Sequence, residues 1–156
     1  MIGYKATYNG YCLNQLYEVG QTHTFYGELI MCLNGFHFCQ DLYDVFTYYN
    51  PNKDIKVFKV EALGNIITEY NKSVTDRIKI LEEVDLRNMV IEKNNKKKYF
   101  NDKGSYIRFE ISNGCWYNYE YDEKDNLIKI EDSYGYWVKL EYDENNNCIK
   151  KEHGKG

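Results

Sequence analysis

The residues best suited to chemistry lie in one short stretch, CLNGFHFC, which runs from Cys32 to Cys39 and includes His37. Thiolates and imidazole are zinc ligands, but the C-x4-H-x-C spacing is not a usual structural zinc pattern, and the sequence offers no second ligand pair. Cys39 and His37 would share one face of a strand, which permits a Cys–His nucleophilic pair. Buried thiols beside a packed histidine are the third interpretation, and we favour it because Cys is most often simply buried.

Other catalytic signatures are missing from the sequence. It has no Gly-rich phosphate loop, Walker pattern or metalloprotease motif, and no carboxylate pair stands out among its 24 acidic residues. Asp41 and Asp44 are most simply charges near a helix terminus. We therefore expect no catalytic residue, no metal and no cofactor, and we favour a non-enzyme.

Composition limits the classes of function. The chain has 156 residues, of which 43% are hydrophobic, and this suits one domain with a small appended module. No apolar run approaches the ~20 residues that a membrane span needs, and the N-terminus lacks the layout of a signal peptide. Five cysteines at irregular spacings indicate free thiols and a cytoplasmic location. A net charge of −4 and a single basic cluster, residues 96–98, argue against unaided nucleic-acid binding.

The elements that position these residues are predicted from periodicity. In QDLYDVFTYYNP the apolar residues fall on one helical face, so a helix is expected over about residues 41–50, ending at Asn50-Pro51. Residues 55–63 alternate as a strand does. The stretch after Lys72 fits a helix start or a strand, and we favour a strand to about Leu81 followed by a short helical turn. Residues 1–90 are therefore expected to form an α+β domain with a mixed, mostly antiparallel sheet.

A 21-residue repeat follows a polar connection expected at residues 91–98. Residues 113–133 and 134–154 are identical at ten of 21 positions, and residues 100–112 form a decayed copy. Each unit has two extended runs split by a polar turn, which predicts a β-meander of hairpins over residues 99–156. Alternation places Trp116 and Trp137 on a half-exposed face opposite a face rich in tyrosine. Because aromatic side chains with polar tips anchor interfaces, we assign these two residues to partner binding.

The unit G-x-W-x-x-x-E-Y-D-x-x-x-N-x-I resembles the tyrosine-aspartate (YD, RHS-type) repeat. Tyr121-Asp122 and Tyr142-Asp143 carry the resemblance, together with Asn126 and Asn147. In that group the repeats form β-sheet shells or short sheet extensions and are structural, so the resemblance implies architecture and no catalysis. It also leaves open that the protein forms a homo-oligomer through this sheet.

The motifs upstream resemble an uncharacterised N-terminal domain of phage and mobile-element proteins. They are GYKA from Gly3, GFHFC from Gly35 and VEALG from Val60. This resemblance implies a protein that works in a host bacterial cytoplasm, and it brings no activity.

A remoter similarity, in the order of elements only, is to ADP-ribosyltransferases. An opening strand is followed by a G-F-x-F-C segment that leads into a helix, and then by a strand. That family carries Ser-Thr-Ser in the middle segment, where this chain has His37, Phe38 and Cys39. Lys5 stands where Arg or His would be expected, and Glu61 is the nearest counterpart of the carboxylate that supports the transfer. The layout implies a ligand site that includes Tyr4, Lys5, His37, Phe38 and Glu61.

These observations lead to one expectation with two alternatives. We expect a non-enzymatic phage or mobile-element binding protein, such as a counter-defence factor, that occupies a host protein or sequesters a nucleotide-like small molecule. The first alternative is an ADP-ribosyltransferase-like enzyme that uses NAD. The second is a structural module that oligomerises through its repeat sheet.

Overall fold

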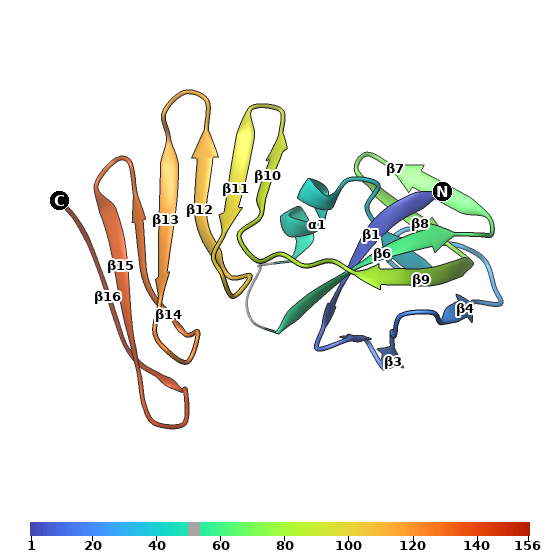
Figure 1. Cartoon of the computed structure of the whole chain (residues 1–156), viewed down its shortest axis with the longest axis horizontal. Helices are drawn as coiled ribbons and strands as arrows, with labels where there is room; N and C mark the ends of the chain where they lie inside the picture. The colour runs from blue at the N-terminus through green and yellow to red at the C-terminus, as the bar shows by residue number, and fades with distance from the viewer. Residues whose placement is uncertain (50–53) are drawn as a thin grey trace. The chain divides into compact units, whose positions relative to one another are not determined.

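The structure, a computed structural model, describes residues 1–49 and 54–156 and is built almost entirely from β-strands (Figure 1). The fold is 56% strand and 5% helix, with three antiparallel sheets and one short helix in the described residues. The predicted α+β class with a mixed sheet is therefore wrong. Helical periodicity is confined to one seven-residue segment, whereas the rest of the chain is rich in Tyr, Ile, Val and Thr, which favour pleated strands.

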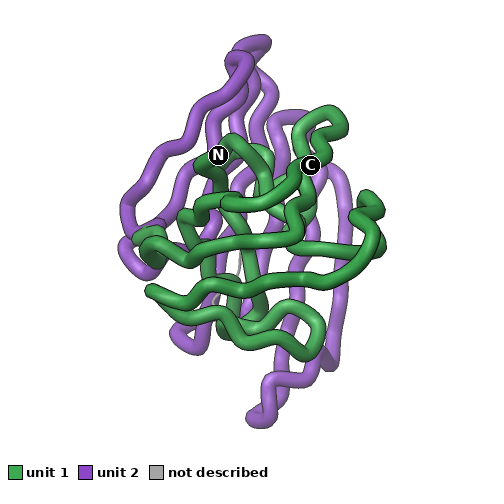
Figure 2. Tube along the Cα trace, turned by 90° about the vertical axis from the view of Figure 1, so that its right-hand side faces the viewer, with its two compact units in different colours: residues 1–85 green, residues 86–156 purple. Residues whose placement is uncertain are grey.

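The chain divides into two compact units, residues 1–85 and residues 86–156 (Figure 2). No helix in the described part of the chain has the length and apolar character that a membrane span requires.

The larger sheet of unit 1 has six strands in the order β3-β2-β1-β6-β9-β4. The long strands β1 and β6 pair along their whole length, with Lys5 opposite Phe58 and Ile2 opposite Glu61. The strands of this sheet are β1 (Ile2–Tyr8), β2 (Tyr11–Cys12), β3 (Gln15–Leu16), β4 (Thr22–Thr24), β6 (Ile55–Ala62) and β9 (Arg77–Glu83).

A smaller sheet of three strands, in the order β5-β8-β7, carries the segment that contains His37. Its strands are β5 (Phe36–Phe38), β7 (Ile66–Glu69) and β8 (Lys72–Thr75). Just after β5, Cys39 exchanges two backbone hydrogen bonds with Tyr4, of 2.7 and 2.8 Å between nitrogen and oxygen. This bridge holds the end of β5 beside β1.

The helix α1 (Leu42–Tyr48) lies where periodicity placed it. Asp41 is its N-cap, and the carboxylate accepts a hydrogen bond from the backbone N–H of Tyr43 at 2.8 Å. The backbone of Tyr49 is extended, so the helix ends at the residue before it. The predicted end at Asn50-Pro51 lies outside the described residues. The helical turn expected after Leu81 does not form, because β9 continues to Glu83.

One core cluster of unit 1 lies on the Phe58 face of the six-stranded sheet, while Ala6 and Val57 are buried on the other face. In this cluster Phe58 and Val60 from β6 pack with Ile78 and Ile80 from β9, and Phe38 reaches them from β5. Val60, Ile78 and Ile80 are wholly inaccessible to solvent. Burial of each such side chain stabilises the fold by about 1.5–3 kcal/mol.

Unit 2 is a seven-stranded antiparallel meander in which every strand pairs with its neighbours in sequence. The predicted hairpins are thereby confirmed. Residues 91–98, expected as a polar connection, lie in the first hairpin of this sheet. The strands are β10 (Val90–Lys93), β11 (Lys96–Phe100), β12 (Tyr106–Ile111), β13 (Trp116–Tyr121), β14 (Leu127–Asp132), β15 (Tyr136–Tyr142) and β16 (Cys148–Lys155).

The repeated residues of unit 2 make the same hydrogen bonds in successive hairpins. The Asp122 carboxylate accepts backbone N–H bonds from Lys124 and Asn126, each at 2.9 Å, and Asp143 does the same one repeat later. The Tyr121 hydroxyl donates to the carbonyl of Tyr106 at 2.7 Å, and the Tyr142 hydroxyl donates to the equivalent carbonyl at 2.9 Å. The repeat therefore encodes turn and inter-hairpin contacts.

Candidate functional site

Unit 1 contains a pocket of about 680 Å³, a volume within the ~300–1,000 Å³ range of small-molecule sites. Strand β1, the β2–β3 hairpin, β5 and the end of α1 all contribute to its wall. Among the described lining residues there are two lysines, one histidine and two cysteines but no carboxylate. The lining residues are Lys5, Cys12, Leu13, Asn14, Gln15, Tyr17, Phe25, Cys32, Leu33, Asn34, Gly35, Phe36, His37, Tyr48, Tyr49 and Lys72.

Lys5 is the most unusual of these residues, because it is a buried lysine with only 5% of its surface exposed. Its ammonium group donates to the backbone carbonyl of His37 at 3.1 Å and lies 4.9 Å from the centre of the Tyr17 ring. Cys12 lines the same pocket. Burial lowers the pKa of Lys5, and the neighbouring thiols of Cys12 and Cys39 offset only part of this effect.

His37 lines the pocket, and its backbone carbonyl accepts the hydrogen bond from Lys5. Its Nε2 atom accepts a hydrogen bond from the backbone N–H of Cys32 at 2.8 Å, which fixes Nε2 as the unprotonated nitrogen. Desolvation lowers the pKa of His37, and the neighbouring amino groups of Lys5 and Lys72 lower it further. The imidazole is therefore neutral at neutral pH. Its hydrogen bond with Cys32 stabilises the loop there, where Cys32 has a left-handed backbone with φ of 64°.

The second lysine of the pocket, Lys72, lies in a different environment. Its ammonium donates to the Sγ atom of Cys32 at 3.1 Å and stands 4.3 Å from the centre of the Tyr48 ring. The hydrogen bond with Cys32 is the main reason that the pKa of Lys72 is raised. Lys72 therefore keeps its positive charge throughout the neutral and mildly alkaline range.

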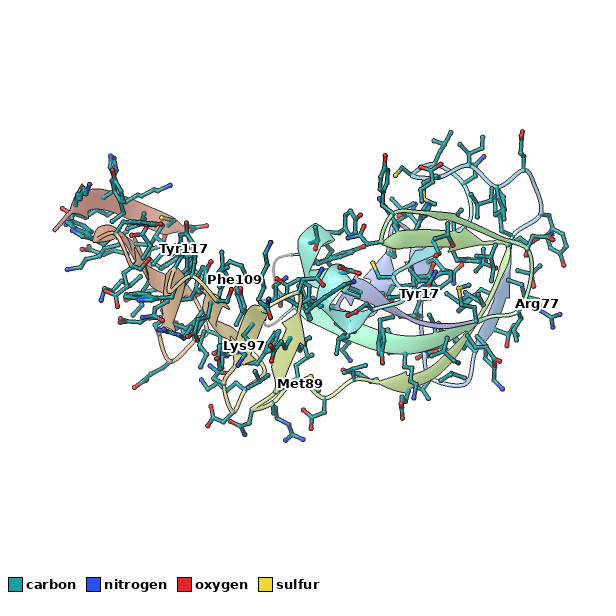
Figure 3. All side chains as sticks on the ribbon, turned by 90° about the horizontal axis from the view of Figure 1, so that it is seen from above. Tyr17, Arg77, Met89, Lys97, Phe109 and Tyr117 are labelled. Atoms are coloured by element: carbon teal, nitrogen blue, oxygen red, sulfur yellow. The ribbon has the colours of Figure 1, made fainter. Side chains whose placement is uncertain are left out.

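Aromatic rings form much of the remaining wall. Tyr17 meets Phe36 edge to face with ring centres 6.5 Å apart, and Figure 3 shows Tyr17 among the side chains between the strands of unit 1. Burial raises the pKa of Tyr17, and burial together with Cys12 raises the pKa of Tyr49 to about 12. Both hydroxyls therefore stay protonated, and they offer polar tips on apolar rings.

The pocket brings together two of the five residues predicted as a ligand site. Lys5 and His37 line it, whereas Phe38 belongs to the core with 3% of its surface exposed. Glu61 lies three residues from Phe58, the partner of Lys5 across the β1–β6 pair, so its side chain is on the opposite face of the sheet. Tyr4 precedes Lys5 and shares that opposite face. Lys5 therefore lies on one face of the six-stranded sheet, whereas Tyr4 and Glu61 of the predicted site lie on the other face.

Trp116 and Trp137 lie in unit 2, on the same face of the meander and on alternate strands, β13 and β15. The Arg108 guanidinium is 5.1 Å from the centre of the Trp116 ring, and the Lys139 ammonium is 5.3 Å from that of Trp137. Both tryptophans are half-buried. On the other face, Phe109 and Tyr117 stack with ring centres 6.3 Å apart (Figure 3).

The zinc and nucleophile interpretations can be compared with the geometry around His37. Cys39 is buried and Cys32 is exposed, and all five cysteines are free thiols. The Nε2 bond of His37 goes to a backbone N–H, so this nitrogen is not placed to deprotonate a thiol. Across residues 1–49 and 54–156, no group of three or more His, Cys, Asp or Glu side chains could hold a metal ion.

Sequence reasoning missed Cys12, Tyr17, Tyr48, Tyr49 and Lys72 as pocket residues. Cys12 and Tyr17 reach the pocket through the β2–β3 hairpin, which folds back beside β1. Asn9-Gly10 predicted the turn between β1 and β2, but a turn signal does not say which side chains the turn brings together. Lys72 meets Tyr48 from a distant part of the chain, and no local pattern predicts such a contact.

Residues 1–92 match the model of a family described as a domain of unknown function, DUF7666. This confirms the uncharacterised N-terminal domain predicted from the GYKA, GFHFC and VEALG motifs. Neither the curated proteins nor the solved structures gave a match. Because the matched residues make up more than half of the sequence, the chain belongs to the DUF7666 family.

Proposed function

We propose that this protein is a non-enzymatic binding protein that sequesters a nucleotide-like small molecule in the pocket of unit 1. The observation that carries this proposal is the chemistry of the wall, in which aromatic rings and two lysines line the pocket and no described lining residue is a carboxylate. Such a wall favours a ligand that joins a flat ring system to an anionic group.

The two parts of the wall have separate roles in this proposal. Tyr17, Phe36 and Tyr48 offer ring faces and edges for a base. Lys72, which is charged and partly exposed, binds the phosphate, and a hydrogen bond to a charged group contributes about 1.5–3 kcal/mol. The volume of about 680 Å³ suits a mononucleotide.

The transferase alternative is less well supported by the same geometry. A carboxylate that stabilises an oxocarbenium-like transition state has to face the sugar of NAD. Glu61, the nearest candidate in sequence, lies on the other face of the sheet from Lys5 and does not line the pocket. We therefore keep binding without turnover as the proposal.

The origin of the protein and the role of unit 2 belong to the same proposal. We assign the chain to phage or mobile elements, acting as a counter-defence factor in a host bacterial cytoplasm, on the strength of the motif resemblance. We also interpret unit 2 as YD/RHS-type repeats that serve as a structural extension. The internal hydrogen bonds of Tyr121 and Asp122 support that interpretation, because they occupy the signature residues in holding the sheet together.

Calorimetric titration with adenosine 5′-monophosphate, adenosine and inorganic phosphate tests the proposal. The monophosphate should bind best, and Lys72→Met should weaken its binding about tenfold, equivalent to about 1.4 kcal/mol. Lys79→Met, which removes an exposed lysine outside the pocket, is the matched control and should leave binding unchanged. Absence of binding by all three probes, or equal binding by Lys72→Met, would contradict the proposal. Incubation with NAD separates the alternative, since turnover would indicate an enzyme.

A further inference from the structure

The two lysines of the pocket differ in a way that ligand binding alone does not require. Lys72 is partly exposed and its pKa is raised by Cys32, so it stays an ammonium ion. Lys5 is 95% buried and its pKa is lowered by desolvation. When neighbouring groups are driven to opposite protonation states, one serves as a charge and the other as an acid, base or nucleophile.

Burial of Lys5 disfavours its ammonium form relative to that of a solvated lysine. The titratable groups around it are the thiols of Cys12 and Cys39, the phenols of Tyr17 and Tyr49, and the imidazoles of His23 and His37. None is a carboxylate, and both phenols have raised pKa values that keep them neutral. A neutral amine that donates one N–H to the His37 carbonyl keeps its lone pair for another atom.

We propose that Lys5 is a nucleophilic amine that forms a reversible imine with a carbonyl group of the ligand in this pocket. The inference rests on the proposed function, and it narrows the ligand class to an anionic aromatic compound with an aldehyde or ketone. Desolvated lysines in apolar pockets are known to act in this way.

The step balances without an oxidant or a reductant. The lone pair of the Lys5 nitrogen attacks the carbonyl carbon, a C–N bond forms, and the π electrons of the C=O bond pass to oxygen. A proton moves from nitrogen to that oxygen to give a carbinolamine. Cys12, which lines the pocket with Lys5, is the neighbouring thiol that can carry this proton. Loss of water then leaves the imine, and water reverses the reaction.

Pyridoxal 5′-phosphate is a suitable probe, because it joins an aromatic ring, a phosphate and an aldehyde. The full chain is incubated with the probe near pH 7, reduced with borohydride, digested and mapped by mass spectrometry. The expected result, at a probe concentration too low to label exposed lysines, is one pyridoxyl group per chain, located on Lys5. A label spread over exposed lysines, a label on Lys72, or no label would overturn the inference.

Pyridoxamine 5′-phosphate separates failure of this inference from failure of the proposed function, because it has the ring and the phosphate but no carbonyl. If it binds by calorimetry and the aldehyde leaves no label on Lys5, the pocket binds such ligands and the imine is wrong. If neither probe binds, the imine inference fails, and the titration with adenosine 5′-monophosphate decides the proposed function.

Two variants complete the test. Lys5→Arg keeps a positive charge, cannot form the imine and should lose the label, while Lys72→Met should keep the label on Lys5 at a higher probe concentration. Circular dichroism checks that each variant folds. Should Lys5→Arg fail to fold, the site of the label in the wild-type chain still decides the matter.

Discussion

The buried amine of Lys5 makes the stability of unit 1 depend on pH in a direction that can be measured. A lysine whose pKa is lower in the folded state than in the unfolded state opposes folding while both states hold the proton. Folding becomes more favourable as pH rises from the folded-state pKa towards the unfolded value of 10.5. Lys5→Met removes this titration and keeps a side chain of similar length, so the comparison of the two proteins isolates it.

The expected slope follows from linkage. Between the two pKa values the unfolded state binds one more proton, so wild-type stability gains about 1.4 kcal/mol per pH unit relative to Lys5→Met. With a urea m-value of about 1.5 kcal/mol/M, the difference between the two urea midpoints should change by about 0.9 M per pH unit. The slope is to be read above the folded-state pKa of Lys5 and below pH 9.5, where unfolded tyrosines are still protonated.

Urea unfolding at half-unit pH steps, under reducing conditions, measures this slope. Both tryptophans lie in unit 2, so circular dichroism and tyrosine fluorescence are the signals to follow. Lys79→Met should show no pH-dependent difference from wild type. Repeating the pair in a Cys12→Ser background removes the thiol that opposes the lowering of the Lys5 pKa. If the difference in urea midpoint between wild type and Lys5→Met stays constant or falls as pH rises, Lys5 stays charged in the folded state. That result would refute the reasoning about both the burial of Lys5 and the imine.

Three further predictions concern packing, the repeat and a histidine. Gly3→Ala should cost about 1–3 kcal/mol in unfolding free energy, because the new Cβ would lie against the Phe38 ring and 2.6 Å from the carbonyl oxygen of Cys39; thermal unfolding measures it, and an unchanged midpoint would contradict the packing. Tyr121→Phe should cost about 0.5–1.5 kcal/mol because it removes one hydrogen bond, whereas Tyr70→Phe, at a fully exposed tyrosine, should cost nothing. His37, with a lowered pKa, should make stability fall as pH drops below about 6.5, and His37→Gln should flatten that fall in acid titrations followed by circular dichroism.

Local sequence patterns predicted where the helix and the hairpins lie, but they did not predict the register between strands. The periodicity of residues 41–50 placed α1, and the 21-residue repeat predicted the hairpins of unit 2. The predicted fold class was wrong because it was based on one short helix, although most of the chain forms strands. The GFHFC motif pointed to His37, which does line the pocket.

The separation of Glu61 from Lys5 illustrates what a sequence does not disclose. Each strand alternates its side chains, so the face of Glu61 depends on which residue of β6 stands opposite Lys5. The structure puts Phe58 there, and an odd number of residues separates Phe58 from Glu61. A shift of one residue would have placed Glu61 on the face of Lys5. Nothing within either strand specifies that register, because it depends on the packing of the whole sheet.

The hydrogen bonds of unit 2 limit what its repeated residues can do for a partner. The carboxylate of Asp122 accepts two backbone N–H bonds within its own turn. The hydroxyl of Tyr121 donates a hydrogen bond to a backbone carbonyl of the neighbouring hairpin. Lys129 is held between Glu120 at 3.0 Å and Glu131 at 2.8 Å. A partner that used these groups would first have to break bonds that hold the sheet together, which costs free energy. Binding by unit 2 would therefore have to use side chains outside these bonds, and the half-buried tryptophans are the natural candidates.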